Sequence, residues 1–293
     1  HTQQCTSGLA CGVNLTLLPD TTAMFNQAGM LAADGRCKTL DARADGYVRG
    51  EGCAVVGVGR LAAVEAAHGN SAPAVLMVSG TSVNQDGRSS SLTAPNGPAQ
   101  QEVIRRALES SGGMSGLQVG VLQMHGTGTA LGDPIEVGAA CAVLTAPQAS
   151  SKAGGRGMAR EEALVLQAGK VYTGHGETAA GLMGAMQSIL QTLQRSSAPL
   201  IHTHSLSVYC LSTVESSLNA QGVQQLSVPR SSGAIEMAVT GTSSFAFQGT
   251  NSHLILKRAD GTTTVAGCSF LASSKPRPTQ RSSYWITHRA HSP

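Results

Sequence analysis

Residues 125–134 read His-Gly-Thr-Gly-Thr-Ala-Leu-Gly-Asp-Pro, a glycine-rich loop that follows a short apolar run. The apolar run, Val119 to Leu122, has the length and composition of a buried strand. Asp133 and Pro134 are residue types that favour the first turn of a helix, so a helix is expected after the loop. A strand, a glycine loop and a helix in succession indicate an α/β fold.

The alternation of strands and helices continues on both sides of this loop. Upstream we expect strands at Ala54–Val58 and Ala74–Ser79, and a helix at Gly97–Ser111 that Gly112 and Gly113 end. Downstream we expect a strand at Ala163–Gln167, a helix at Glu177–Arg195, and a pair of strands, Ile235–Thr240 and Leu254–Leu256, around a turn at Gln248-Gly249. The sequence therefore predicts an α/β domain with a mixed sheet.

The composition fits this fold and excludes several function classes. The 293 residues are 41% hydrophobic and only 13% charged, and they include 35 glycines, as expected of an α/β core with tight turns. A formal charge of +3 is too small to indicate a nucleic-acid surface. Aromatic residues make up 3%, which argues against base-stacking platforms.

The cysteines and the apolar runs indicate the compartment. The seven cysteines are Cys5, Cys11, Cys37, Cys53, Cys141, Cys210 and Cys268. Their odd number, wide spacing and lack of a C-x-x-C pair favour reduced thiols and a cytoplasmic location. We expect Cys5 and Cys11 to be buried as small hydrophobes. No apolar run reaches membrane-spanning length, and the start at His1 predicts a processed chain or a fragment.

Three segments place polar groups at the ends of predicted strands: residues 125–134, 170–177 and 244–253. The glycine spacing of the first, G-x-G-x-x-x-G, fits neither the dinucleotide fingerprint nor the P-loop. Taken singly, a histidine between glycines is usually structural and a lysine near a helix start is usually solvated. His202 and His204 lack a nearby third ligand, so no metal site is expected. The occurrence of all three segments in this order favours a catalytic site.

Together the segments resemble the ketosynthase domain of type I polyketide and fatty-acid synthases, in the thiolase-like superfamily. The resemblance covers roughly Gly12 to Lys257. Further stretches that match in order are Gly12–Leu15, Ala28–Leu31, Asp34–Lys38, Asp45–Gly52, Asn84–Arg88 and Ala94–Pro98. The resemblance implies a layered α/β/α/β/α fold, of which this chain is mostly the C-terminal half.

The resemblance also implies a reaction: decarboxylative Claisen condensation of acyl and malonyl-type thioesters in fatty-acid or polyketide biosynthesis. By resemblance, His125 and His175 are the imidazole pair that stabilises an enolate oxygen, and Lys170 is the ammonium that orders the site. The family's nucleophilic cysteine lies in a T-A-C-S-S motif upstream of the Gly12 segment, and none of the seven cysteines matches it. We therefore expect a fragment that lacks the nucleophile.

The expected ligands and partners follow from the same resemblance. Thr127 and Thr129 would hydrogen-bond a phosphopantetheine arm, and Phe247 would gate the acyl pocket with its backbone N–H in the oxyanion hole. No resident cofactor is implied, because phosphopantetheine arrives on the acyl carrier protein. The remainder of a multidomain synthase and a second copy in a homodimer are the other expected partners. Two departures stand out: Tyr172 occupies the place of an asparagine, and Ala246 that of a glycine.

The expected organisation has three parts. Residues 1–60 end the N-terminal ketosynthase half, residues 61–260 form the C-terminal half with an insertion at 145–162, and residues 261–293 are a tail. Pro278–Ile286 in this tail is similar to the linker that follows the acyltransferase in modular synthases. The main alternative function is a catalytically incomplete remnant that acts as a scaffold or docking domain. A Rossmann-type oxidoreductase is a more distant alternative.

Overall fold

The computed structural model describes residues 5–60, 76–87, 94–146, 160, 162–217, 224–235 and 238–258. Its strands are β1 (Ser7–Asn14), β2 (Gly52–Gly59), β3 (Leu76–Gln85), β4 (Val121–Gln123), β5 (Leu164–Gln167), β6 (Ser196–Ser197), β7 (Leu226–Ser227), β8 (Gly233–Ala234), β9 (Val239–Phe245) and β10 (Thr250–Arg258). Its helices are α1 (Pro19–Gln27), α3 (Gly97–Ser110), η2 (Gly116–Gln118), α4 (Gly132–Leu144), α5 (Lys170–Thr173), η3 (Glu177–Ala179), α6 (Ala180–Gln194) and α7 (Val208–Ser216).

A mixed six-stranded sheet with the order β3-β10-β9-β4-β5-β7 forms the centre of the molecule. β9 and β10 pair antiparallel around a short turn, and β3 pairs antiparallel with β10. β4 pairs parallel with both β9 and β5, and β5 pairs parallel with β7. The α/β class and the mixed sheet predicted from the sequence are thus confirmed.

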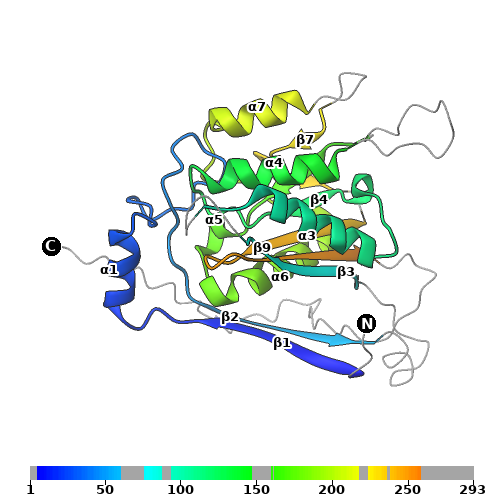
Figure 1. Cartoon of the computed structure of the whole chain (residues 1–293), viewed down its shortest axis with the longest axis horizontal. Helices are drawn as coiled ribbons and strands as arrows, with labels where there is room; N and C mark the ends of the chain where they lie inside the picture. The colour runs from blue at the N-terminus through cyan, green and yellow to red at the C-terminus, as the bar shows by residue number, and fades with distance from the viewer. Residues whose placement is uncertain are drawn as a thin grey trace, which may run out of the picture.

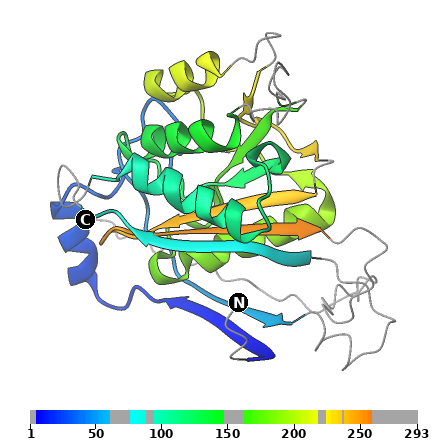
Figure 2. The ribbon, with the colours of Figure 1, turned by 45° about the vertical axis from the view of Figure 1, so that its right-hand side comes forward.

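Helices cover both faces of this sheet, as Figures 1 and 2 show. α3 and α4 pack together on one face, with α7 outside α4, and α6 lies on the other face against β9. Beyond α6 lies a two-stranded antiparallel ribbon, β1–β2. The layers therefore run from helices through the sheet and α6 to the ribbon.

The main core lies between the sheet and the α3–α4 layer. α3 begins with a satisfied N-cap, because the Asn96 side chain accepts a hydrogen bond from the Ala99 amide, and Pro98 lies in the first turn. Its apolar face meets apolar side chains from α4 and the strands. The fully buried members of this core include Val103, Ala107, Val119, Leu122, Val137, Ala140, Leu144, Leu164, Leu166 and Ile255.

The β1–β2 ribbon differs from the expectation in its burial. The buried strand predicted at Ala54–Val58 does form the centre of β2, yet Val55 is 51% exposed and only Ala54 is fully buried. Cys5 and Cys11, expected to be buried, are exposed. The reason is that only the inner face of the ribbon packs on α6 and η3, so alternate residues point outward.

Other differences concern boundaries. The helix predicted at Glu177–Arg195 is a 3₁₀ turn, η3, followed by α6. The strand predicted at Ile235–Thr240 is shifted, because β9 begins at Val239 and extends to Phe245, and β10 is longer than the predicted Leu254–Leu256. The greater part of the 145–162 insertion, the 261–293 tail and the Pro278–Ile286 linker lie outside the described residues. Within the described part of the chain, no helix combines the length and apolar character needed to cross a membrane.

Candidate active site

His125 lies directly beyond the end of β4, where the glycine loop begins. Its Nδ1 atom lies 3.3 Å from the Phe245 backbone nitrogen, which donates to it, and 3.4 Å from Lys170 Nζ. Lys170 also donates to the His125 backbone oxygen at 2.5 Å. Because both neighbours of Nδ1 are hydrogen-bond donors, Nδ1 is an acceptor and the ring proton lies on Nε2.

His175 comes from the turn between α5 and η3 and has the same tautomer. The Glu177 backbone amide donates to His175 Nδ1 at 3.0 Å, which leaves the proton on Nε2. The centroids of the His125 and His175 rings are 5.3 Å apart, and the ring planes meet at 81°. Two imidazoles from different elements therefore lie edge to face, each with an N–H available at Nε2.

Both histidines are neutral at physiological pH. Burial, with smaller contributions from Lys170 and His175, lowers the pKa of His125 well below the ordinary 6.5. Burial and the charge of Lys170 lower the pKa of His175 to about 3. Neutral imidazoles of this kind carry no net charge, and each can donate its Nε2–H to an oxygen that gains negative charge.

Two buried carboxylates from the first turns of α4 hold the glycine loop. Glu136 accepts from the His125 amide at 2.6 Å and from the Gly126 amide at 2.8 Å. Asp133 accepts from the Gly128 amide at 3.2 Å and from the Leu40 amide at 2.7 Å. Burial raises the pKa of Asp133 to about 6 and that of Glu136 to about 7, and the backbone hydrogen bonds oppose both shifts.

Lys170, at the start of α5, is the buried cation of the site, with a residue exposure of 8%. Burial lowers the pKa of Lys170 to about 8, while the charges of Glu136, Cys37 and Asp133 act in the opposite direction. With its ammonium on the backbone oxygen of His125 and the Glu136 carboxylate on the backbone nitrogen, the His125 peptide is fixed from both sides.

The two imidazoles face a cavity of about 160 Å³, here called the histidine cavity. Its lining includes Met30, Tyr47, Pro95, Gln100, His125, Thr127, Thr129, His175, Phe245 and Phe247. The Thr127 and Thr129 hydroxyl oxygens lie 3.4 Å apart, and Thr129 also accepts from the Gly132 amide. Phe247 is 47% exposed at the turn between β9 and β10.

The structure thus brings five of the six predicted site residues into the lining of one cavity, and Lys170 contacts His125 from behind it. Sequence reasoning gave no role to Asp133 or Glu136 as loop anchors. The signal was present, because two carboxylates three residues apart on a helix share one face. Tyr47 was missed as well; its ring packs edge-on against His175 at 4.9 Å.

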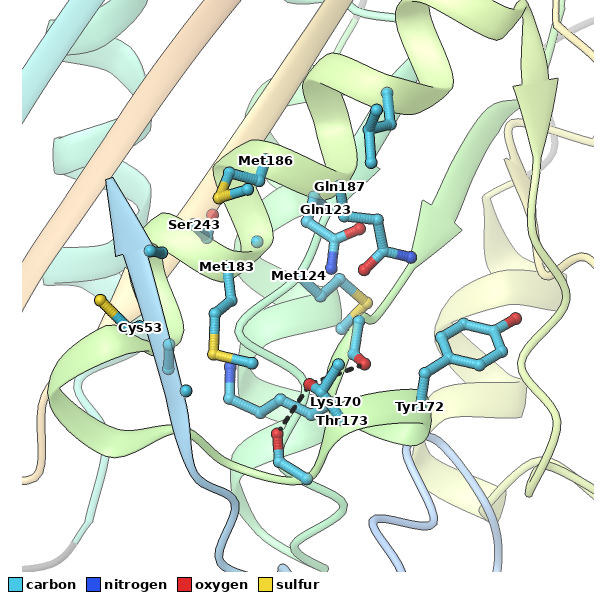
Figure 3. A pocket seen from close by; sticks show the side chains of 17 residues that line it. Cys53, Gln123, Met124, Lys170, Tyr172, Thr173, Met183, Met186, Gln187 and Ser243 are labelled. Carbon is cyan, nitrogen blue, oxygen red and sulfur yellow. Dashed lines mark hydrogen bonds between the residues drawn. The ribbon is translucent and has the colours of Figure 1, made fainter. Parts of the chain in front are cut away.

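Tyr172, which departs from the family motif, does not line the histidine cavity. Its hydroxyl donates to the Pro199 carbonyl, and the side chain lines a second cavity of about 320 Å³. Figure 3 shows this methionine cavity, with Met124, Met183 and Met186 on its walls and the amides of Gln123 and Gln187 side by side. The departure therefore lies outside the lining of the cavity with the two histidines.

Among the residues that the structure describes, the lining of the histidine cavity includes no cysteine. In the part of the chain that the structure describes, no group of three His, Cys, Asp or Glu side chains is arranged to hold a metal ion. Cys37 is buried, contacts the backbone of Val48, and has a pKa raised by burial. None of the described cysteines lines the histidine cavity.

Two family descriptions match the chain. Residues 1–63 match the beta-ketoacyl synthase N-terminal domain, and residues 75–204 match the beta-ketoacyl synthase C-terminal domain. The chain belongs to the β-ketoacyl synthase family. The thiolase-like ketosynthase fold expected from the sequence is supported by solved structures as well. The ketosynthase from module 6 of the bacillaene synthase of Bacillus subtilis 168 matches with a TM-score of 0.72 and 27% identity.

Curated relatives of this ketosynthase chain are polyketide synthases. One protein of the phenolphthiocerol/phthiocerol polyketide synthase of Mycobacterium tuberculosis is 40% identical over 262 residues, 88% of this chain and 11% of the relative. Erythronolide synthase EryA3 of Saccharopolyspora erythraea is 38% identical over 87% of this chain and 8% of the relative. The match with the bacillaene ketosynthase includes 88% of this chain and 43% of the ketosynthase. It thus spans a small part of the curated relatives and under half of that solved domain.

Proposed function

We propose that this chain supplies the decarboxylating half-site of a β-ketoacyl synthase that acts on carrier-bound thioesters in polyketide or fatty-acid biosynthesis. The observation that carries the proposal is the pair of neutral imidazoles, each with its proton on Nε2, at one cavity. Their Nδ1 atoms are both occupied by donors, so the Nε2–H groups that remain are free to donate to an oxygen that gains negative charge.

The proposed reaction uses these two donors together. The carboxylate of a malonyl-type thioester leaves as carbon dioxide, and the electron pair of the broken C–C bond forms an enolate on the thioester oxygen. His125 and His175 donate to this oxygen, each with a contribution of roughly 3 kcal/mol in comparable oxyanion sites. The enolate carbon then attacks the carbonyl carbon of an acyl thioester, and the thiolate that held the acyl group leaves.

The remaining assignments support this chemistry. Lys170 is a positioning residue, because its ammonium fixes the His125 peptide and keeps Nδ1 an acceptor. Thr127 and Thr129 would bind the phosphopantetheine arm, whose amides match their hydroxyl groups. Phe247, half exposed at the rim, would gate the acyl pocket.

The partners proposed are an acyl carrier protein and the other parts of a multidomain synthase in the cytoplasm. The ketosynthase segments beyond the 43% that this chain matches would supply the acyl-bearing cysteine and a homodimer interface. Residues 1–60 would be the last part of the N-terminal ketosynthase half, and residues 61–260 would form the C-terminal half.

The proposal is tested by carbon dioxide release from malonyl-carrier protein with the purified chain. Release that disappears in the His125→Ala, His175→Ala double variant is expected, because both enolate donors are then lost. The control is Arg106→Met, which changes an exposed residue on α3. No release from the folded parent chain would contradict the proposal and leave a scaffold or docking role as the better description.

A further inference from the structure

The tautomer of His175 depends on a backbone amide in an unusual conformation. Glu177, whose amide donates to His175 Nδ1, has a φ of +39°, in the left-handed region that residues with a side chain rarely adopt. Without a restraint, this residue would relax toward negative φ and turn its N–H away from the imidazole. The surrounding structure must therefore hold Glu177 in place.

Arg49 provides that restraint through a two-point ion pair. Its Nε atom donates to Glu177 Oε1 at 2.5 Å, and its Nη2 atom donates to Oε2 at 3.1 Å. The arginine side chain is only 9% exposed and that of the glutamate 22%. A forked, shielded pair of this kind fixes the direction of the carboxylate as well as its distance.

The other side of the guanidinium is fixed by α1. Arg49 Nη1 donates to the hydroxyl oxygens of Thr21 and Thr22 at 3.0 and 2.7 Å, and the guanidinium lies 5.2 Å from the centre of the Phe25 ring.

At the backbone, Arg49 forms a parallel bridge with His175. The His175 amide donates to Val48 O at 2.7 Å, and Gly50 donates to His175 O at 2.8 Å. The segment around Arg49 therefore holds both the histidine and the turn that follows it.

We propose that Arg49 and Glu177 are positioning residues that fix His175 as its Nε2–H tautomer. The ion pair holds the Glu177 backbone at positive φ, and the Glu177 amide then occupies Nδ1 of the histidine. In the opposite tautomer, Nε2 would present a lone pair to the cavity and repel an enolate oxygen instead of binding it. The consequence for catalysis rests on the proposed function, whereas the consequence for the tautomer is a property of the folded chain.

The test is the protonation of the histidine nitrogens, read from the ¹⁵N chemical shifts of the imidazoles in the full chain. In the parent, we expect His175 to show protonated Nε2 and bare Nδ1. In Arg49→Met, the Nδ1–H form is expected to appear as a second population, whereas Arg49→Lys, which keeps the charge, is expected to restore part of the parent signal. Arg106→Met, which removes an exposed arginine from a comparable glutamate pair, is the matched control.

A second pair of variants separates the effect of the backbone conformation at residue 177 from the effect of the Glu177 carboxylate. Glu177→Gly removes the carboxylate but accepts positive φ, and Glu177→Ala removes it and resists positive φ. We expect the glycine variant to keep more of the Nε2–H form than the alanine variant. The buried His253, whose Nδ1 lies 3.0 Å from Ser243 Oγ, serves as an internal reporter that the fold is intact.

An unchanged His175 signal in both Arg49→Met and Glu177→Ala, with the His253 signal intact, would overturn the proposal. If the parent also releases carbon dioxide, Arg49→Met is expected to lower kcat on the order of tenfold with little change in KM, because a donor at the reacting oxygen is misplaced. If the parent releases no carbon dioxide but Arg49→Met still shifts the His175 tautomer, this inference is supported and the proposed function is contradicted. The two failures are therefore distinguishable.

Discussion

A single buried carboxylate, Glu136, accounts for much of the shape of the loop that carries His125. Its two oxygens accept from two consecutive backbone amides, and Lys170 contacts the same peptide from the carbonyl side. Both charged side chains are almost wholly buried, so neither has water as an alternative partner. The position of the His125 imidazole therefore follows from the hydrogen bonds that the buried Glu136 carboxylate and Lys170 ammonium form with its backbone.

Replacing Glu136 with glutamine is expected to destabilise the fold by about 2 kcal/mol, because one amide N–H loses its acceptor and meets an NH₂ group instead. Chemical denaturation of the two proteins measures the difference. The control is Glu102→Gln on the exposed surface of α3, for which little change in stability is expected. Equal stability of parent and Glu136→Gln would show that the carboxylate does not hold the loop.

At this scale the sequence predicts some roles and not others. His125, His175 and Lys170 could be assigned because each lies in a short ordered motif. The role of Glu136 depends on α4, which brings this carboxylate back to the backbone of His125, eleven residues earlier in the chain. The role of Arg49 depends on its contact with Glu177, which is 128 positions away. Spacing along the chain carries no direct signal for the pair of Arg49 and Glu177, whereas the three-residue spacing of Asp133 and Glu136 does place both carboxylates on one face of a helix.

Among the elements, the contact between β3 and α3 is unusually close. A Cβ atom on Gly80 would lie 2.2 Å from the backbone oxygen of Ala107 and 2.9 Å from Ser111 Cβ. Gly80 also lies beside the irregularity at which the register between β3 and β10 shifts. The glycine therefore permits helix and strand to approach, a role that its surroundings in the sequence do not reveal.

We expect Gly80→Ala to destabilise the fold by roughly 1–3 kcal/mol, because strand and helix must separate. Gly138→Ala is the matched comparison, since a Cβ atom at this position in α4 meets nothing within 4 Å. That substitution is expected to stabilise the protein by about 0.5–1 kcal/mol through helix propensity. Thermal unfolding of both variants measures these effects, and a neutral Gly80→Ala would contradict the close packing.

Element types follow from local patterns, whereas burial follows from what packs on them. The helix α3 and the strand β5 agree closely with the expected Gly97–Ser111 and Ala163–Gln167, because their signals are local. The exposed Val55 does not, since an apolar run reads the same whether one face or both are covered.

At the scale of the whole molecule, the outer face of the β1–β2 ribbon is an exposed apolar surface. It consists of Leu9, Cys11, Val13 and Val55, all on the side of β1–β2 turned away from α6. Leu9 is 75% exposed and Val13 is 56% exposed. A flat apolar strand surface of this kind promotes association between copies or with another chain.

We therefore expect the purified chain to associate and to be poorly soluble. Leu9→Lys combined with Val55→Thr is expected to raise the monomer fraction measured by sedimentation velocity. Val208→Lys, which changes a 69% exposed residue on α7, is expected to leave the distribution as it is. A parent chain that sediments as a monomer and melts cooperatively would refute the expectation.

The most direct test of a site built from two neutral N–H donors is the pH dependence of carbon dioxide release from malonyl-carrier protein. Burial holds the pKa of His175 at about 3 and that of Lys170 at about 8. The imidazoles are therefore predicted to stay neutral above about pH 5, and release is predicted to fall above about pH 8, as the lysine loses the proton that orders His125. Between about pH 6 and pH 7, release is predicted to depend only on the loop anchors Glu136 and Asp133, whose pKa values are about 7 and about 6. A rise through about pH 6.5 that persists in Glu136→Gln and in Asp133→Asn would show an ordinary imidazole that must lose a proton, and would contradict this assignment of the two histidines.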